Sequence, residues 1–322
     1  MKKLISFLML SMTIAATAQQ VLSQDVQKKN NSQGNANKQG NPGPPLPKPT
    51  FADVSYGPDE SNVLDFWKAP PGPLLVMIHG GGFRAGSKSQ MSAALLQACH
   101  KAGISVASVE YRFTQKAPFP AQMLDCARAL QFIRSKASEW GFDPKRVAAT
   151  GGSAGAGISL WLGFHDDLAD PTSNDPIARE STRLTCIVPT QMQCTYDPRE
   201  IKTIVPGKAY DISAIKFLFG LPATFNWDTD TVSPELDAQL KEGAPITHLT
   251  KDDPPVYAVN DKSADVDGNI HHANFARHLK RLMDEMGIEC SIHMDSDFAN
   301  YQAAQEDKMA FLKKHLGVAD TK

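Results

Sequence analysis

The chain has 322 residues, of which 42% are hydrophobic and 21% are charged, and its formal net charge is −2. This profile is typical of a globular protein, and the length allows one large domain or two of ordinary size. Because there is no basic excess, the composition argues against nucleic acid or an anionic membrane surface as the main partner.

The first residues have the features of a secretory signal peptide. Residues 1–3 supply a basic start, residues 4–14 form an apolar run, and residues 16–18 (Ala-Thr-Ala) offer a cleavage site. The apolar run is too short to span a bilayer comfortably. We therefore expect residues 1–18 to be removed and the mature protein to be secreted or periplasmic, with no stable membrane span.

A polar segment follows the predicted signal. Residues 19–50 are rich in Gln, Asn, Lys, Gly and Pro, a composition that cannot bury enough apolar surface to offset the entropy of ordering. We expect a disordered linker here. The remaining residues, 51–322, form the predicted domain.

Strand and helix patterns alternate along the predicted domain. The expected strands are 63–67, 74–78, 104–109, 146–150, 186–188, 256–259 and 288–294, and the expected helices are 91–102, 123–133, 156–161, 275–286 and 301–316. Such alternation predicts the α/β class, with a doubly wound, mostly parallel sheet. Residues 195–250 interrupt the pattern and are interpreted as a cap-like insertion.

A nucleophile motif follows one predicted strand. Residues 151–155 are Gly-Gly-Ser-Ala-Gly, a G-x-S-x-G pentad placed between a short strand and the start of a helix. That context is the one a nucleophile elbow requires, with Ser153 on the sharp turn and small residues around it. Amides at the start of the following helix favour a developing negative charge.

A second glycine-rich segment follows the strand at 74–78. Residues 79–83 are His-Gly-Gly-Gly-Phe, and consecutive glycines let backbone N–H groups approach a ligand without side chains in the way. Together with the amide after Ser153, these groups are able to bind an oxyanion.

With both motifs in place, the chain resembles the HGGG-type bacterial carboxylesterases, a group that includes hormone-sensitive-lipase-like, acetyl-xylan and feruloyl esterases. Glu110-Tyr111-Arg112 and the segment 143–146 before the elbow support the resemblance, which covers roughly residues 60–316 apart from the insertion. The resemblance implies the α/β-hydrolase fold. It also implies that Ser153 is the nucleophile.

The same resemblance implies an oxyanion hole made by the amides of Gly81, Gly82 and Ala154. In this fold the catalytic acid follows the strand after the insertion. Asp265 lies nearest to that position, with Asp261 and Asp267 as alternatives.

The catalytic histidine of the family is expected after the last strand, where relatives show a His-x-Phe-like pattern. This chain has Ser296-Asp297-Phe298 there instead, and neither serine nor aspartate can replace an imidazole near neutral pH. His271 and His272, on the loop after the acid strand, are the best substitutes. His293 and the absence of any base remain alternatives.

The sequence is therefore compatible with two functions. The first is a secreted serine carboxylesterase that acts on a small or medium carboxylic ester, with an acyl group on a polysaccharide as one possible substrate by analogy with relatives. The second is a hydrolase-fold protein that binds a carbonyl or anion in the same pocket with little or no turnover, because the usual histidine is missing.

No metal or cofactor is expected. The chain has no C-x-x-C pair or His/Cys cluster typical of zinc, and Asp166, Asp167 and Asp170, which follow His165, lack an EF-hand pattern.

The chain has five cysteines. Cys186 and Cys194 are close enough in sequence to form a disulfide in an oxidising compartment. For Cys99, Cys126 and Cys290 the alternative is that they are buried as small apolar side chains.

Overall fold

A computed structural model describes residues 45–319 of the chain. The predicted signal peptide and the predicted linker up to residue 44 lie outside the described residues. The last residues of that predicted linker pack against the domain, because the indole Nε1 of Trp67 donates to the carbonyl oxygen of Pro47 at 2.7 Å. Among the described helices, none has the length and apolarity that crossing a membrane requires.

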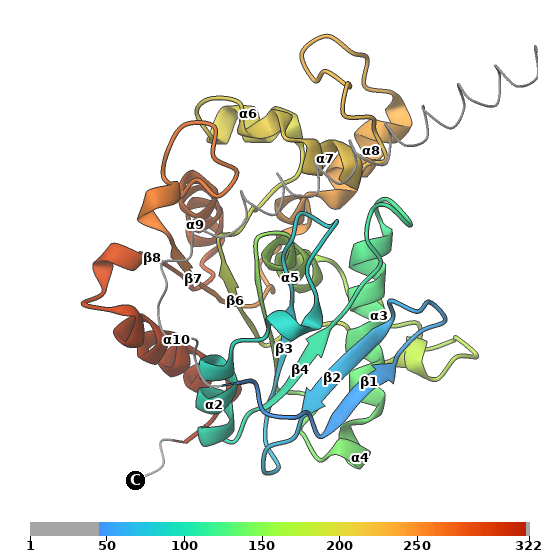
Figure 1. Ribbon diagram of the computed structural model, residues 1–322, viewed down its shortest axis with the longest axis vertical. Coiled ribbons are helices and arrows are strands. Elements are labelled where there is room, and N and C mark those ends of the chain that lie inside the picture. Colours follow the sequence, from blue (N-terminus) through green and yellow to red (C-terminus); the bar gives the residue numbers. More distant parts are fainter. Residues whose placement is uncertain (1–44, 320–322) are drawn as a thin grey trace, which may run out of the picture. The chain divides into compact units, whose positions relative to one another are not determined.

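The centre of the domain is an eight-stranded sheet with the strand order β1-β2-β4-β3-β5-β6-β7-β8 (Figure 1). The strands are β1 Phe51–Ser55, β2 Val63–Trp67, β3 Leu74–Ile78, β4 Ser105–Val109, β5 Val147–Gly152, β6 Cys186–Thr190, β7 Val256–Asn260 and β8 Cys290–Met294. The pairs β1–β2 and β2–β4 are antiparallel and every pair from β4 onwards is parallel. The predicted fold class is confirmed, and β1 is an edge strand that the sequence did not predict.

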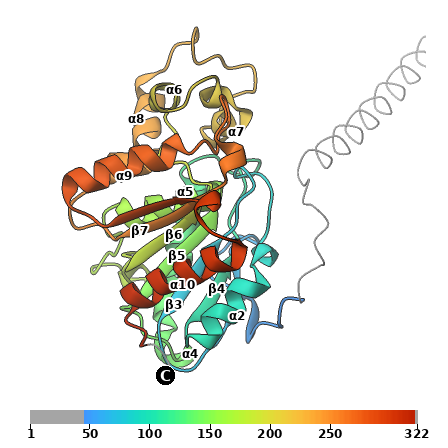
Figure 2. The ribbon, with the colours of Figure 1, turned by 90° about the vertical axis from the view of Figure 1, so that its left-hand side faces the viewer.

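Helices cover both faces of the sheet. They are α2 Ala93–Lys101, α3 Ala121–Ser135, α4 Ala137–Trp140, α5 Ala154–Phe164, α9 Asn274–Met286 and α10 Tyr301–Leu316. Alternate β3 residues belong to two different core clusters, Val76 to the one with α3, α5 and α9, and Met77 to the one with α2 and α10. Figure 2 shows α2 and α10 together on the near face. Burial on both faces explains why β3 is apolar at every position.

The insertion is mainly helical. It contains α6 Pro198–Ile204, α7 Ser213–Leu218 and α8 Pro234–Gly243, followed by the 3₁₀ turn η4 Pro245–His248. Figures 1 and 2 show α6, α7 and α8 gathered beyond one end of the sheet. A Cβ placed on Gly82, in the loop after β3, would lie 3.4 Å from the Cβ of Ala214 in α7. The insertion therefore packs on the glycine-rich loop at the carboxyl end of β3.

The proposed Cys186–Cys194 disulfide is wrong. All five cysteines are free thiols, and all are buried. Cys186 belongs to the core cluster with α2 and α10, whereas Cys194 belongs to the cluster on the other side of the sheet. Each therefore serves as a small apolar core residue.

Candidate active site

Ser153 lies on a sharp turn between β5 and α5. Its backbone has φ 53° and ψ −119°, a conformation that costs energy for any residue with a Cβ. Close packing around the turn excludes side chains at Gly151 and Gly155. A Cβ on Gly151 would approach the carbonyl oxygen of Ile78 to 2.5 Å, and one on Gly155 would approach the same oxygen to 2.0 Å.

The glycine-rich loop lies directly beside this turn. β3 and β5 are parallel neighbours with Ile78 opposite Gly151, so the segments that follow them leave the same edge of the sheet. A Cβ on Gly80 would lie 2.5 Å from the oxygen of Gly152 and 3.5 Å from the Cβ of Ser153. The two motifs, which begin 72 residues apart in sequence, thus form one site.

Three backbone amides at this site are available to a ligand. Gly81 and Gly82 have φ angles of 116° and 61°, which glycine adopts far more readily than other residues. Within residues 45–319, the amides of Gly81, Gly82 and Ala154 form no hydrogen bond with another protein group. Ala154 is the first residue of α5, so its free amide also lies at the positive end of a helix dipole.

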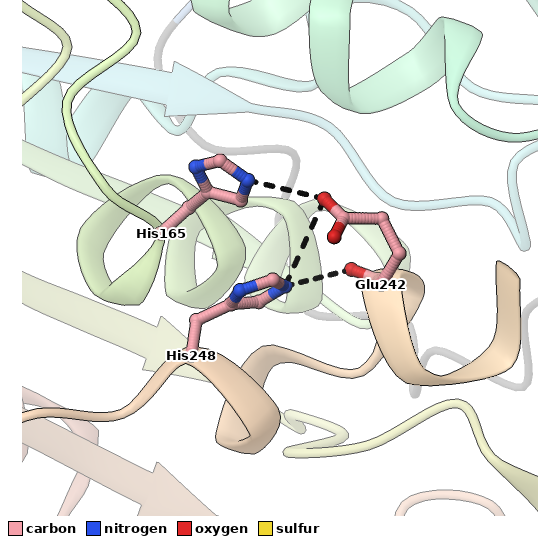
Figure 3. A group of neighbouring side chains, drawn as sticks. All are labelled: His165, Glu242 and His248. Atoms are coloured by element: carbon pink, nitrogen blue, oxygen red, sulfur yellow. Dashed lines mark hydrogen bonds and ion pairs between the residues drawn. The ribbon is translucent and has the colours of Figure 1, made fainter. Parts of the chain in front are cut away.

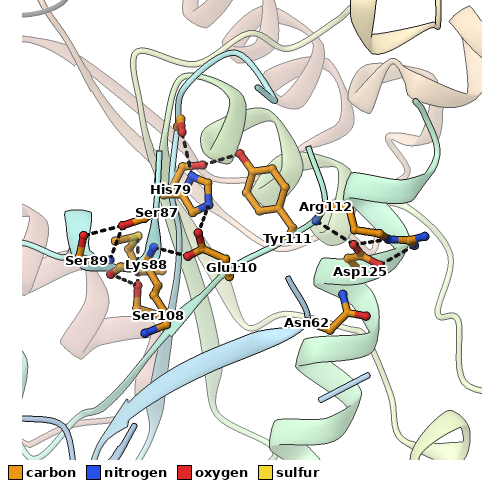
Figure 4. Close-up of polar contacts among 12 residues, drawn as sticks. Asn62, His79, Ser87, Lys88, Ser89, Ser108, Glu110, Tyr111, Arg112 and Asp125 are labelled. Atoms are coloured by element: carbon orange, nitrogen blue, oxygen red, sulfur yellow. Dashed lines mark hydrogen bonds and ion pairs between the residues drawn. The ribbon is translucent and has the colours of Figure 1, made fainter. Parts of the chain in front are cut away.

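A polar network holds His79, the first residue of the glycine-rich loop (Figure 4). The Tyr111 hydroxyl donates to the carbonyl oxygen of His79 at 2.9 Å, and the two rings are stacked with centroids 4.3 Å apart. His79 Nδ1 lies 2.8 Å from the carbonyl oxygen of Gly80. Burial lowers the pKa of His79, so at neutral pH the ring is uncharged and Nδ1 donates this hydrogen bond. These contacts fix the path of the loop before Gly81.

The Glu110-Tyr111-Arg112 segment also has contacts on either side of that tyrosine. The Glu110 carboxylate accepts from the amide of Lys88 at 2.6 Å. Arg112 binds the two carboxylate oxygens of Asp125 at 2.8 and 2.7 Å, which ties the segment to α3. The role of this sequence is therefore to hold the loop and the neighbouring helix together.

His271 is the histidine that contacts Ser153. It lies on the loop between β7 and α9, and its Nε2 is 2.9 Å from the Ser153 Oγ. Burial lowers the pKa of His271, so the ring is neutral at neutral pH and Nε2 is able to accept the hydroxyl proton. Among the described residues, no group accepts a hydrogen bond from its other nitrogen, Nδ1.

Asp265 and His272 pair with each other rather than with Ser153. His272 Nδ1 lies 3.2 Å from Asp265 Oδ1, and Arg277 contacts both oxygens of the same carboxylate at 3.2 and 2.9 Å. The hydrogen bond from Arg277 is the main reason that the pKa of Asp265 is lowered, despite some opposing burial. In the part of the chain that is described, neither Asp265 nor His272 forms a hydrogen bond with Ser153 or His271.

The other sequence candidates have different contacts. Asp261 accepts from the amide of Ser263 at 2.8 Å and so caps a turn. His293 Nε2 lies 3.9 Å from an oxygen of Asp307 on α10. Where the family histidine is expected, Asp297 accepts from the amide of Met294 at 2.8 Å and closes a 3₁₀ turn. The structure brings none of these residues to Ser153.

The loop that carries His271 is held by contacts that have no sequence motif. The side chain of Asn269 accepts from the His271 amide at 2.8 Å. Gln193 donates to the carbonyl oxygen of Ile270 at 3.0 Å, and the amide of Gly268 donates to the oxygen of Pro206 at 2.7 Å. Asn269 and Gln193 were missed by sequence reasoning, because a single amide side chain carries no pattern.

Curated relatives share part of this chain. A probable carboxylic ester hydrolase, LipM, of Mycobacterium tuberculosis is 28% identical over 223 residues, which cover 66% of this chain and 47% of that protein. Carboxylesterase NlhH of the same species is 37% identical over 87 residues, which cover 27% of each chain. The chain thus spans about half or less of the length of these relatives.

Solved structures share the fold. A truncated carbohydrate esterase from gut microbiota aligns with a TM-score of 0.64 at 20% identity, over 83% of this chain and 96% of that one. An acetyl ester-xyloside bifunctional hydrolase from Caldicellulosiruptor lactoaceticus aligns with a TM-score of 0.63 at 16% identity, over 84% and 97%. These likenesses, together with the sheet order, establish the α/β-hydrolase fold.

One family model matches residues 67–272, which is more than half of the chain and includes both glycine motifs and the loop up to His272. The chain belongs to the BD-FAE family.

Proposed function

We propose that this protein is a serine carboxylesterase in which Ser153 is the nucleophile and His271 is the general base. The observation that carries the proposal is the 2.9 Å distance between His271 Nε2 and Ser153 Oγ. A serine on a strained turn, beside free backbone amides and a neutral imidazole, has the parts that acyl transfer requires.

In the proposed acylation, Ser153 Oγ attacks the ester carbonyl carbon while its proton moves to His271 Nε2. The amides of Gly81, Gly82 and Ala154 donate to the oxyanion of the tetrahedral intermediate. His271, now an imidazolium, donates its proton to the alkoxy oxygen as the carbon–oxygen bond breaks. The alcohol leaves, and the acyl group stays on Ser153.

Deacylation reverses these roles with water. His271 takes a proton from water as the water oxygen attacks the acyl carbon, and the same amides bind the second oxyanion. The proton then returns to Ser153 Oγ as the acid leaves. Asp265 has no direct part in this scheme. Its contacts with His272 and Arg277 instead position the loop that carries His271.

The substrate class is part of the same proposal. We include acyl groups carried on polysaccharides among the candidate substrates, because the two structural neighbours named above are described as a carbohydrate esterase and an acetyl ester-xyloside bifunctional hydrolase. Export to the periplasm or beyond, which the N-terminal sequence predicts, would place the protein where such polymers occur.

The test is labelling by a fluorophosphonate probe, with Ser153→Ala as the control variant. We expect the wild-type protein to be labelled and to hydrolyse p-nitrophenyl acetate, and the variant to lose both properties. Folded wild-type protein that stays unlabelled at high probe concentration would refute the esterase proposal.

The alternative is binding without turnover, and one observation favours it. Within the described residues His271 Nδ1 has no acidic partner, so no carboxylate stabilises an imidazolium at this site. In that case the protein would bind a carbonyl or anion at the free amides, and the probe would leave Ser153 unmodified.

A further inference from the structure

A second group of side chains lies at the far end of the helix that begins at the elbow (Figure 3). His165 directly follows α5, Glu242 lies near the end of α8, and His248 ends the turn η4. The His165 Nε2 atom is 3.1 Å from Glu242 Oε1, and His248 Nε2 is 3.9 Å from the same oxygen. One nitrogen from each ring and one carboxylate oxygen all lie within 4.8 Å of one another.

The hydrogen bonds of His165 fix where its proton is. Its Nδ1 lies 2.9 Å from the carbonyl oxygen of Asp166, and because a carbonyl only accepts, Nδ1 must carry the hydrogen. In a neutral ring Nε2 then presents a lone pair to Glu242 Oε1. Two acceptors 3.1 Å apart repel each other unless a positive charge lies between them. A metal ion bound between the two atoms would supply that charge.

The geometry suits a metal ion. Two imidazole nitrogens and one carboxylate oxygen form a known ligand set for Zn²⁺, which has bond lengths of about 2.0–2.2 Å. Tetrahedral bonds of that length separate neighbouring ligand atoms by about 3.3–3.6 Å. The observed separations of 3.1 and 3.9 Å lie on either side of this range, so small side-chain rotations would complete the site.

The surroundings hold the ligands in place. The indole ring of Trp161 lies against His165, with centroids 4.3 Å apart, and the two imidazoles are 4.6 Å apart. The side chains of His165 and His248 are only 18% and 16% exposed, whereas Glu242 is 47% exposed. The two imidazoles are therefore held by ring packing against each other and against Trp161, and the site is open to solvent on the Glu242 side.

Metal binding would cost one hydrogen bond at His248. In the metal-free arrangement Nε2 of His248 donates to the carbonyl oxygen of Glu242 at 2.8 Å, and a metal would replace that proton. The same carbonyl also accepts from Trp161 Nε1 at 2.8 Å. It therefore keeps a partner after His248 turns to the metal.

We propose that His165, Glu242 and His248 bind one divalent transition-metal ion of the Zn²⁺ class, with water completing the coordination. His165 lies twelve residues after Ser153, or about 18 Å along a helix, so the ion would be structural. It would fasten the insertion to the helix that begins at the nucleophile. This proposal does not depend on esterase activity.

The test is calorimetric titration of the EDTA-treated, dialysed full chain with ZnCl₂, together with measurement of bound zinc by mass spectrometry. We expect one equivalent of Zn²⁺ per chain and a higher unfolding temperature. Glu242→Gln keeps the shape of the side chain and removes its charge, and His248→Ala removes a ligand. Each should weaken binding by about tenfold or more.

His293→Ala is the matched control, because His293 also faces a carboxylate but, among the described residues, no second histidine joins that pair. This variant should bind zinc as the wild type does. Circular dichroism of the zinc-free variants checks that they fold. If His248→Ala does not fold, His248→Gln is used in its place. Wild-type protein that binds no zinc, or zinc binding unchanged in Glu242→Gln and His248→Ala, would overturn the proposal.

Discussion

At the scale of single residues, the position of Ser153 is the most costly local feature of the site. A backbone at φ 53° and ψ −119° is destabilising by about 1–3 kcal/mol for a non-glycine residue. The surrounding contacts must offset that cost, since Gly80, Gly151 and Gly155 let two strands and a helix close around the turn. A strained backbone at this position is consistent with a function that depends on the direction of the Ser153 side chain.

The choice between His271 and His272 leads to the first prediction. We expect His271→Ala to lower kcat for ester hydrolysis by about 10²–10⁴-fold, the contribution typical of general acid–base catalysis. His272→Ala should lower it by less than about tenfold, because the His272 ring contacts Asp265 and the amide of Asn274 rather than Ser153. Steady-state kinetics on p-nitrophenyl acetate measures both. A larger loss in His272→Ala than in His271→Ala would contradict the assignment.

The acid side of the pH profile gives a second prediction. Burial lowers the pKa of His271 below its usual 6.5, and only the neutral ring can accept the Ser153 proton. The value of kcat/KM should therefore fall as the pH drops, with a midpoint below 6.5. Asp265→Asn should leave that midpoint in place, since Asp265 does not contact His271. A midpoint above 6.5 that drops in Asp265→Asn would show that the carboxylate acts on the base.

At the residue scale, a sequence motif predicts a position where it constrains the backbone, and it gives no prediction where only tertiary contacts decide. The pentad around Ser153 requires glycines because the turn is tight, so its position was predictable. His271 and His272 are adjacent on an irregular loop, and nothing local says which ring turns inward. The orientation of the two rings is set by tertiary contacts. Asn269 accepts from the His271 amide, and Asp265 contacts the His272 ring.

At the scale of elements, the contact between β3 and α5 leads to a third prediction. A Cβ on Gly155 would lie 2.0 Å from the oxygen of Ile78 and 2.6 Å from that of His79, and both are backbone atoms that cannot rotate away. We expect Gly155→Ala to lower the free energy of unfolding by about 1–3 kcal/mol or more, and to lower esterase activity by moving the glycine-rich loop.

Gly152→Ala is the control for that substitution. Its Cβ would have Thr190 Oγ1 at 3.4 Å as its nearest neighbour, so unfolding should change by less than about 1 kcal/mol. Urea denaturation of the two variants and the wild type measures the difference. Equal stability of Gly155→Ala and wild type would mean that the strand and helix are less closely packed than we describe.

The elements themselves were predicted unevenly, for physical reasons. Strands buried on both faces and long amphipathic helices give clear patterns, and β3 and α10 have the predicted bounds. The short helices α6 and α8 were missed because the period of their apolar residues is weak. Their starts do carry a local signal, since Asp197-Pro198 and Ser233-Pro234 each place a capping side chain before a proline.

At the scale of the whole molecule, the sheet separates two cores that sequence spacing cannot distinguish. Cys186 and Cys194 are eight residues apart, and that closeness suggested a disulfide. Cys186 is the first residue of β6, whereas Cys194 lies in the segment after β6 and packs in the core on the other side of the sheet. Likewise, the ligands of the proposed metal site come from residues 165, 242 and 248, and no spacing rule connects them.

The thiols give the fourth prediction, which tests the whole domain at once. Burial raises the pKa of Cys99, Cys186 and Cys290 to about 12, and it raises that of the other two thiols as well. Buried, protonated thiols are poor nucleophiles. We therefore expect iodoacetamide at neutral pH to leave the native protein unmodified and to alkylate all five cysteines in denaturant without prior reduction.

Dithiothreitol should not shift the unfolding temperature, because no disulfide joins the two cores. If the protein expressed with its own N-terminal segment into an oxidising compartment showed a reductant-sensitive unfolding temperature, it would have to contain a disulfide, and the free state of all five thiols would be contradicted.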